Sequence, residues 1–144
     1  MTTHNHVGLT VSDLDRSAAF YRDVVGMEEA SRNDNIGGDW FDRLTNNQGA
    51  RFRVVHLTLG GLTLQLVEYL AAGGDTLALA HKHVGNAHLC FNVDDFDGQR
   101  ARVEAHGGGG FVSPVVSLPG GRSRSFYVAD PDGVLVEFIG EASS

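Results

Sequence analysis

Apolar and polar residues alternate strictly at two places in the chain. Residues 6–11 read HVGLTV and residues 88–93 read HLCFNV. In each stretch Val, Leu or Phe occupy one side, and His, Gly, Thr, Cys or Asn occupy the other. A period of two over six residues predicts a strand with one buried face.

A helix is predicted directly after each of these strands, over about 13–25 and about 95–106. Ser12 and Asp94, which follow the last strand residue, are the expected N-caps. Each strand is therefore followed at once by a helix, and the chain carries this unit twice.

The second half of the chain repeats the first with two different offsets. His6 aligns with His88 at an offset of 82, whereas residues 60–69 align with residues 132–141 at an offset of 72. The difference of ten residues (82 minus 72) predicts an insertion in the first half. The polar segment 33–50 is the natural place for it.

Each half therefore reads as a strand, a helix and three further strands. Module one covers about 4–70, a linker covers about 71–85, and module two covers about 86–140, within a single domain. The remaining strands are expected at about 27–32, 51–59, 111–116 and 122–129.

Composition and charge argue against several classes of partner. The net charge of -7 argues against nucleic acid and anionic membranes. No apolar run approaches the length of a membrane helix, and the N-terminus has no signal pattern. A single cysteine, Cys90, excludes an intrachain disulfide framework. We therefore expect a cytoplasmic protein.

Metal-competent side chains lie on the non-core faces of the repeated strands. The repeat aligns His6 with His88 and Gln65 with Glu137. A lone strand histidine is more often structural, but a carboxylate in the apolar stretch VLVEFIG requires a cation or a proton. Together the two imidazoles, the amide and the carboxylate suit a divalent transition ion such as Zn, Ni, Co, Mn or Fe.

The segments HVGLTVSDLDRSAAFYRDVVGM and FYVADPDGVLVEFIG, with the repeat, resemble the vicinal-oxygen-chelate superfamily. This superfamily includes glyoxalase I, methylmalonyl-CoA epimerase, extradiol dioxygenases, fosfomycin-modifying enzymes and bleomycin-resistance proteins. The resemblance implies an α+β fold, in which two βαβββ modules form an incompletely closed, eight-stranded barrel-like sheet with helices outside. It also implies a homodimer.

The family's four metal-ligand positions fall on His6, Gln65, His88 and Glu137. The glyoxalase and epimerase branches imply proton transfer at the carbon next to a metal-bound carbonyl. Glyoxalase I generally has Glu where this chain has Gln65, and the stretch GNAHLCFNVDDFD looks epimerase-like. Because an amide is no base, the expected base is Glu137 or another cavity residue, for which His56 is the best candidate. The sequence leaves open on which side of its strand His56 lies, and a core or edge histidine is the other interpretation.

Other branches of the superfamily remain alternatives. An extradiol iron dioxygenase would use His6, His88 and Glu137 as ligands, but its proton-donating histidine is missing from residues 118–120. A metal-free antibiotic-binding protein and a thiol transferase are the other candidates. Retention of all four metal-competent groups favours the isomerase, epimerase or lyase.

Four further residues have two interpretations each. Trp40 and Phe41 in the insertion form either a hydrophobic lid or a dimer contact. Arg122 and Arg124 either clamp an anionic group or lie on a solvated strand edge, and the solvated edge is favoured. His81 lies in the linker and is expected to be solvated.

Overall fold

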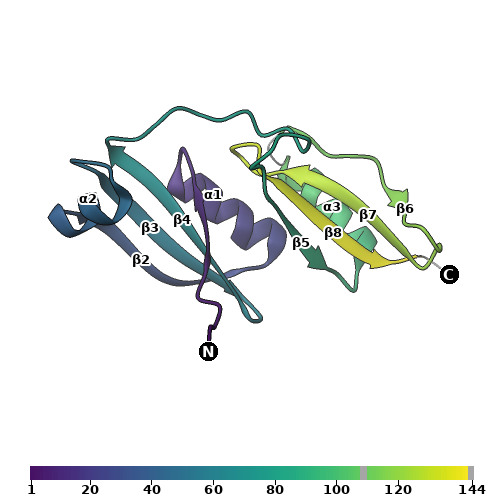
Figure 1. The fold of residues 1–144 in the computed structure, drawn as a ribbon. Coiled ribbons are helices and arrows are strands. Elements are labelled where there is room, and N and C mark those ends of the chain that lie inside the picture. Colours follow the sequence, from purple (N-terminus) through teal and green to yellow (C-terminus); the bar gives the residue numbers. More distant parts are fainter. Residues whose placement is uncertain (108–109, 143–144) are drawn as a thin grey trace. The chain divides into compact units, whose positions relative to one another are not determined.

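The computed structural model describes residues 1–107 and 110–142. The chain forms two compact units, Met1–Thr76 and Leu77–Ser144. Each unit contains one four-stranded sheet, with the orders β1-β4-β3-β2 and β5-β8-β7-β6. The fold is α+β and built from two βαβββ modules, as predicted (Figure 1).

The helices and strands follow the predicted order in both units. The first unit contains β1 (Val7–Thr10), α1 (Leu14–Phe20), a π-helical turn (Tyr21–Val25), β2 (Glu28–Gly37), α2 (Asp39–Thr45), β3 (Arg51–Leu59) and β4 (Leu62–Ala71). The second contains β5 (His88–Asn92), α3 (Phe96–His106), β6 (Val116–Ser117), β7 (Ser123–Ala129) and β8 (Leu135–Glu141). Among the described residues, no helix is long and apolar enough to cross a membrane.

Strand register confirms both offsets of the repeat. In each unit the first strand runs parallel to the last, and Gly8 lies opposite Gln65 as Cys90 lies opposite Glu137. These two pairs are related by 82 residues on one strand and 72 on the other. The two sheets are therefore built on the same register, so equivalent sequence positions are also equivalent structural positions.

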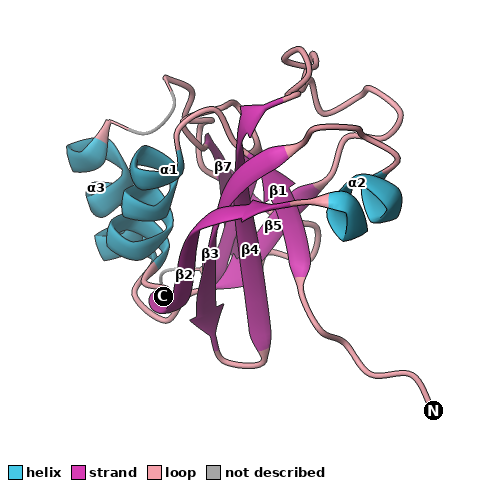
Figure 2. Cartoon of the chain, turned by 90° about the vertical axis from the view of Figure 1, so that its left-hand side faces the viewer, coloured by secondary structure: helices cyan, strands magenta, loops and turns pink. Residues whose placement is uncertain are grey.

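In the first unit, the two faces of the sheet have different coverings. Leu64 and Leu66 of β4 are fully buried on the face that carries α1. Helix α2 lies on the opposite side of these strands (Figure 2), where Phe41 and Phe52 pack with ring centroids 4.3 Å apart. Gln65, between Leu64 and Leu66, lies on the α2 side because strand residues alternate.

The insertion contains more regular structure than expected. Strand β2 extends to Gly37 rather than to about residue 32, and the next residues form α2. Phe41 is 7% exposed in this helix. The burial of this ring against β3 holds the polar segment 33–50 on the sheet. The local sequence pattern of the segment does not indicate this tertiary contact.

Two other expectations were wrong in detail. The N-caps are Asp13 and Asp95, one residue later than predicted, with side chains that accept from the N–H groups of Arg16 and Gly98. The strand expected at 111–116 is reduced to β6 and a single bridge at Val112.

Proline chemistry explains the loss of this strand. Pro114 has no N–H to donate to a ladder. The neighbouring Ser113 hydroxyl instead accepts from the Tyr127 N–H at 2.8 Å. A side-chain oxygen thus takes the place of a backbone acceptor beside β7.

Candidate functional site

The first unit places three predicted site residues on one face of its sheet. His6 directly precedes β1, and His56 of β3 lies opposite Gln65 of β4. The His6 and His56 rings are 6.0 Å apart between centroids. The side of β3 on which His56 lies, left open by the sequence, is the side that carries Gln65.

Hydrogen bonds determine which atoms of Gln65 and His56 are donors and which are acceptors. The Gln65 amide N–H donates to His56 Nε2 at 3.1 Å, and the other ring nitrogen of His56 bonds the Ser31 hydroxyl at 3.1 Å. Burial, and to a smaller degree His6, lower the pKa of His56. His56 is thus neutral at pH 7, with Nε2 as the acceptor that holds the Gln65 amide.

The remaining donor atoms of this group are free for a ligand. His6 Nδ1 donates to Asn5 Oδ1 at 2.5 Å, which leaves the Nε2 lone pair available. The Gln65 amide oxygen lies 3.6 Å from the position that a Cβ on Gly8 would occupy. One ring nitrogen and one amide oxygen are therefore available in the first unit.

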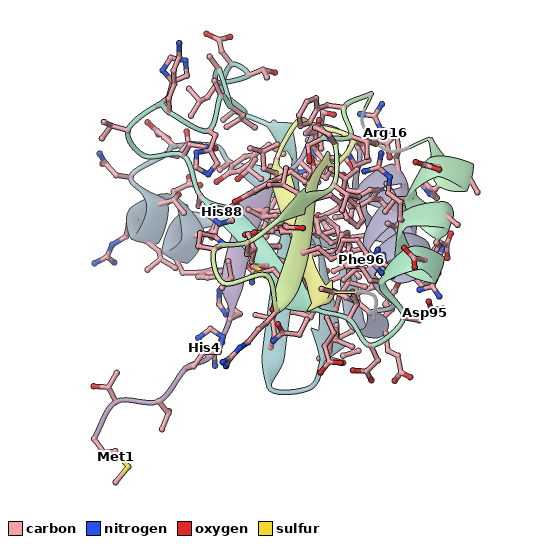
Figure 3. All side chains as sticks on the ribbon, turned by 90° about the vertical axis from the view of Figure 1, so that its right-hand side faces the viewer. Met1, His4, Arg16, His88, Asp95 and Phe96 are labelled. Carbon is pink, nitrogen blue, oxygen red and sulfur yellow. The ribbon has the colours of Figure 1, made fainter. Side chains whose placement is uncertain are left out.

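The second unit gathers polar groups around Glu137. Ser125 Oγ donates to Glu137 Oε1 at 2.7 Å, and the Tyr127 hydroxyl donates to Oε2 at 3.1 Å. His88 Nε2 lies 3.6 Å from the same Oε2. In Figure 3, His88 points away from the helix side of the sheet, where Phe96 packs. Glu137 is thus a partly buried carboxylate with several hydrogen-bond partners.

These contacts keep Glu137 ionised. Burial alone would raise the pKa of Glu137, but hydrogen bonds from Ser125, Tyr127 and Cys90 outweigh it and lower the pKa. The same carboxylate, after burial, helps to raise the pKa of Cys90 to about 11 and also raises that of Tyr127. Cys90 is therefore a neutral thiol at pH 7, and the negative charge of this group belongs to Glu137.

Sequence reasoning missed three neighbours of this carboxylate group. His81 is exposed, as expected, but its ring lies 5.3 Å from His88 and 5.6 Å from Tyr127 between centroids. Ser125 and Tyr127 were not identified as partners of Glu137. A signal for Tyr127 was available, because it lies opposite Glu137 just as His56 lies opposite Gln65.

The two arginines of the second unit have different surroundings. Arg124 pairs with Asp97 at 3.0 Å and covers the Phe96 ring at 4.4 Å, so it ties β7 to α3. Arg53 and Asp15 form the equivalent pair in the first unit at 3.1 Å. Arg122 is exposed. Arg124 is therefore a structural residue rather than an anion clamp or a solvated edge residue.

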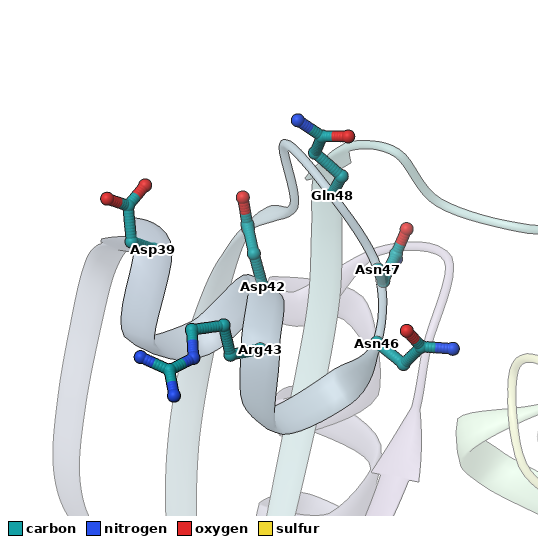
Figure 4. A pocket seen from close by; sticks show the side chains of 6 residues that line it. All are labelled: Asp39, Asp42, Arg43, Asn46, Asn47 and Gln48. Carbon is teal, nitrogen blue, oxygen red and sulfur yellow. The ribbon is translucent and has the colours of Figure 1, made fainter.

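The first unit also has two hollows on either side of helix α2. A polar one of about 480 Å³ is lined by Asp39, Asp42, Arg43, Asn46, Asn47 and Gln48 (Figure 4). A largely apolar one of about 440 Å³ has His6, His56 and Gln65 in its wall together with Trp40 and Phe41. Only the apolar hollow is continuous with predicted site residues.

Each unit by itself supplies few ligands for a metal. Within residues 1–107 and 110–142, no group of three or more His, Cys, Asp or Glu side chains could hold an ion. The first unit offers His6 and Gln65, and the second offers His88 and Glu137. The repeated register makes Gln65 and Glu137 equivalent positions of the two units.

Residues 3–138 match the glyoxalase/bleomycin resistance protein/dioxygenase superfamily, and the chain belongs to this family. It is 32% identical over 141 residues to a 2-epi-5-epi-valiolone epimerase from Actinomyces, covering 94% of this chain and 77% of the relative. It is 31% identical over 140 residues to a lactoylglutathione lyase from Neisseria meningitidis, covering 96% and 90%.

A solved structure has the same fold. A glyoxalase family protein from Bacillus cereus superimposes with a TM-score of 0.86 at 20% identity, covering 99% of this chain and 96% of that one. At this identity the likeness concerns the fold. The sequence relatives include both an epimerase and a lyase.

Proposed function

We propose that this protein is a metal-dependent isomerase, epimerase or lyase that moves a proton at the carbon next to a carbonyl of a small molecule. The observation that carries the proposal is the equivalence of the two half-sites, with Gln65 opposite Gly8 and Glu137 opposite Cys90. The similarity to an epimerase and to a lactoylglutathione lyase supports it.

His6, Gln65, His88 and Glu137 are the proposed ligands of one divalent ion per chain. Their chemistry fits: two imidazoles, an amide oxygen and one ionised carboxylate suit Zn, Ni, Co, Mn or Fe. The hydrogen bond that His6 Nδ1 donates to Asn5 orients the imidazole, and the hydrogen bonds that Ser125 and Tyr127 donate to Glu137 orient the carboxylate. A divalent ion bound by them would polarise the substrate carbonyl.

The identity of residue 65 favours epimerisation over glyoxalase-type isomerisation. A glutamate at this position would add a second negative charge and a second base. Gln65 adds neither, and its N–H is engaged by His56. The site therefore keeps a net positive charge with one carboxylate, which favours the developing enolate.

Glu137 and His56 are the proposed proton carriers, one in each half-site. Glu137 is an ionised carboxylate, and His56 presents a neutral ring beside Gln65. Two-face proton transfer requires a group on each side of the carbon. The bond between His56 and Gln65 also gives His56 a positioning role.

Solvent exchange tests the reaction directly. In D2O with metal, the protein should place deuterium at the α-carbon of an α-hydroxyketone or acyl thioester. His56→Ala should slow this exchange by about 100-fold, the usual contribution of a general base, while metal content is kept. His83→Ala, at an exposed turn position, is the matched control. Oxygen consumption with catechols, or no exchange with any such substrate, contradicts the proposal.

We also propose a symmetric homodimer. The two sheets have outer strands, and unpaired strand edges favour association. Sedimentation at micromolar concentration should give about twice the 15.4 kDa of one chain. A stable species of 15.4 kDa would contradict the dimer.

A further inference from the structure

The apolar hollow of the first unit has one polar end and one aromatic end. His6, His56 and Gln65 lie in its wall at the proposed ligand half-site. The rest of the wall is apolar and comes from the sheet and from α2. Its volume of about 440 Å³ is within the range of pockets that hold small molecules.

Aromatic rings form the far wall in a connected series. Phe41 of α2 lies 4.3 Å from Phe52 of β3, and Phe52 lies 6.0 Å from Tyr69 of β4, with interplanar angles of 40° and 36°. Trp40 extends the series, 5.4 Å from Phe41. Such a wall offers both faces and edges to a further ring, the two geometries that aromatic pairs prefer.

The helix that closes this hollow exposes apolar side chains. Trp40 is 60% exposed and Leu44 is 74% exposed, although both line the hollow. An apolar group placed against them would remove this surface from water, which is favourable. The exposed surfaces of Trp40 and Leu44 thus lie where a molecule bound in the hollow would cover them.

The described residues that line the hollow include no Asp, Glu, Lys or Arg. A phosphate or carboxylate placed at the aromatic end would lose its hydration and gain no opposite charge, which is costly. The hollow therefore discriminates against substrates that would place an anionic group against its apolar wall.

We propose that the substrate carries an uncharged aryl group next to its reacting carbonyl, and that this group binds between α2 and the aromatic wall. The inference rests on the proposed function, because it assigns the polar end of the hollow to the reacting carbonyl. Trp40 and Leu44 are then specificity-determining residues.

A pair of α-hydroxyketones tests the inference with the metal-loaded protein. 2-Hydroxyacetophenone and hydroxyacetone share the reacting group and differ in a phenyl against a methyl substituent. In D2O the α C–H bond breaks, the proton passes to solvent and a C–D bond forms, so no co-reactant is needed. The phenyl compound should exchange with a kcat/KM about 10- to 100-fold higher. Its 4-carboxylate derivative should lose most of this advantage.

Two leucines of similar exposure provide matched variants. Leu44→Ala should lower kcat/KM for the phenyl ketone by about threefold or more relative to kcat/KM for hydroxyacetone. Leu77 is 76% exposed and lies outside the hollow. Leu77→Ala should therefore leave kcat/KM for the phenyl ketone unchanged. Leu44→Arg should restore activity toward the 4-carboxylate derivative, because it supplies the missing opposite charge.

Failure of this inference is distinguishable from failure of the proposed function. Equal exchange of both ketones overturns the aryl pocket and leaves the reaction intact. If neither ketone exchanges, saturation-transfer NMR measures binding of the two ketones. Selective binding of the phenyl compound that is lost in Leu44→Ala upholds the aryl pocket, and equal binding of both ketones overturns it. Dissociation of a dimer by Leu44→Arg, with no change in selectivity, would assign α2 to a second copy of the chain and overturn the inference.

Discussion

Replacement of Glu137 with glutamine is expected to reduce deuterium exchange by about 100- to 10,000-fold, the range expected when a general base is removed. The side chain keeps its size but loses its charge. Ser125 Oγ and the Tyr127 hydroxyl both donate to the carboxylate, whereas an amide offers them one oxygen and one NH2 group. The variant therefore weakens the proposed metal site and removes a proton carrier at the same time.

Glu141→Gln provides the control for this variant, because Glu141 is an exposed residue at the end of the same strand, β8. It should exchange at the wild-type rate. Initial rates at saturating substrate, with metal content measured on the same samples, separate loss of the ion from loss of the base. If Glu137→Gln exchanges deuterium within a factor of about three of the wild-type rate, the loss is far below the contribution of a general base. That result would show that Glu137 takes no part in the mechanism.

Phe126→Ala is expected to lower the free energy of unfolding by about 3–5 kcal/mol, the usual cost of removing a buried phenyl ring. Phe126 is 1% exposed. Its ring lies 5.3 Å from Phe96 and 5.4 Å from Phe138 between centroids, and Arg100 lies 5.0 Å from its centre. The change leaves a cavity at the junction of α3, β7 and β8.

Urea unfolding followed by circular dichroism measures this loss. Phe111→Ala is the matched control, since Phe111 belongs to the same unit and is 50% exposed. Phe111→Ala should lower the free energy of unfolding by less than about 1 kcal/mol. Because Phe126 lies between Ser125 and Tyr127, Phe126→Ala should also reduce activity. A loss of stability equal to that of Phe111→Ala would contradict the packing described for the second unit.

Local pattern was sufficient to predict the repeated strands and their register. Alternation placed His6 and His88 at the beginning of equivalent strands, and two offsets aligned Gln65 with Glu137. The observed registers reproduce both offsets because strand pairing follows from which face is buried. Helices α1 and α3, which directly follow these strands, were also predicted from the sequence.

Features that depend on tertiary contacts were not predicted. Helix α2 depends on the burial of Phe41 against β3, which no local period encodes. The hydroxyls of Ser125 and Tyr127 become partners of Glu137 only when β7 pairs with β8. The position of His81 beside His88 likewise depends on the course of the linker.

Metal content tests the central claim most directly, since the claim is that one histidine from each half of the repeat binds a single ion. Elemental analysis of the purified protein should give one divalent ion per chain. His6→Ala and His88→Ala should each lose most of it, while His4→Ala, two residues from His6, should retain it. A wild-type protein without metal, or full metal content in both His6→Ala and His88→Ala, would contradict the account.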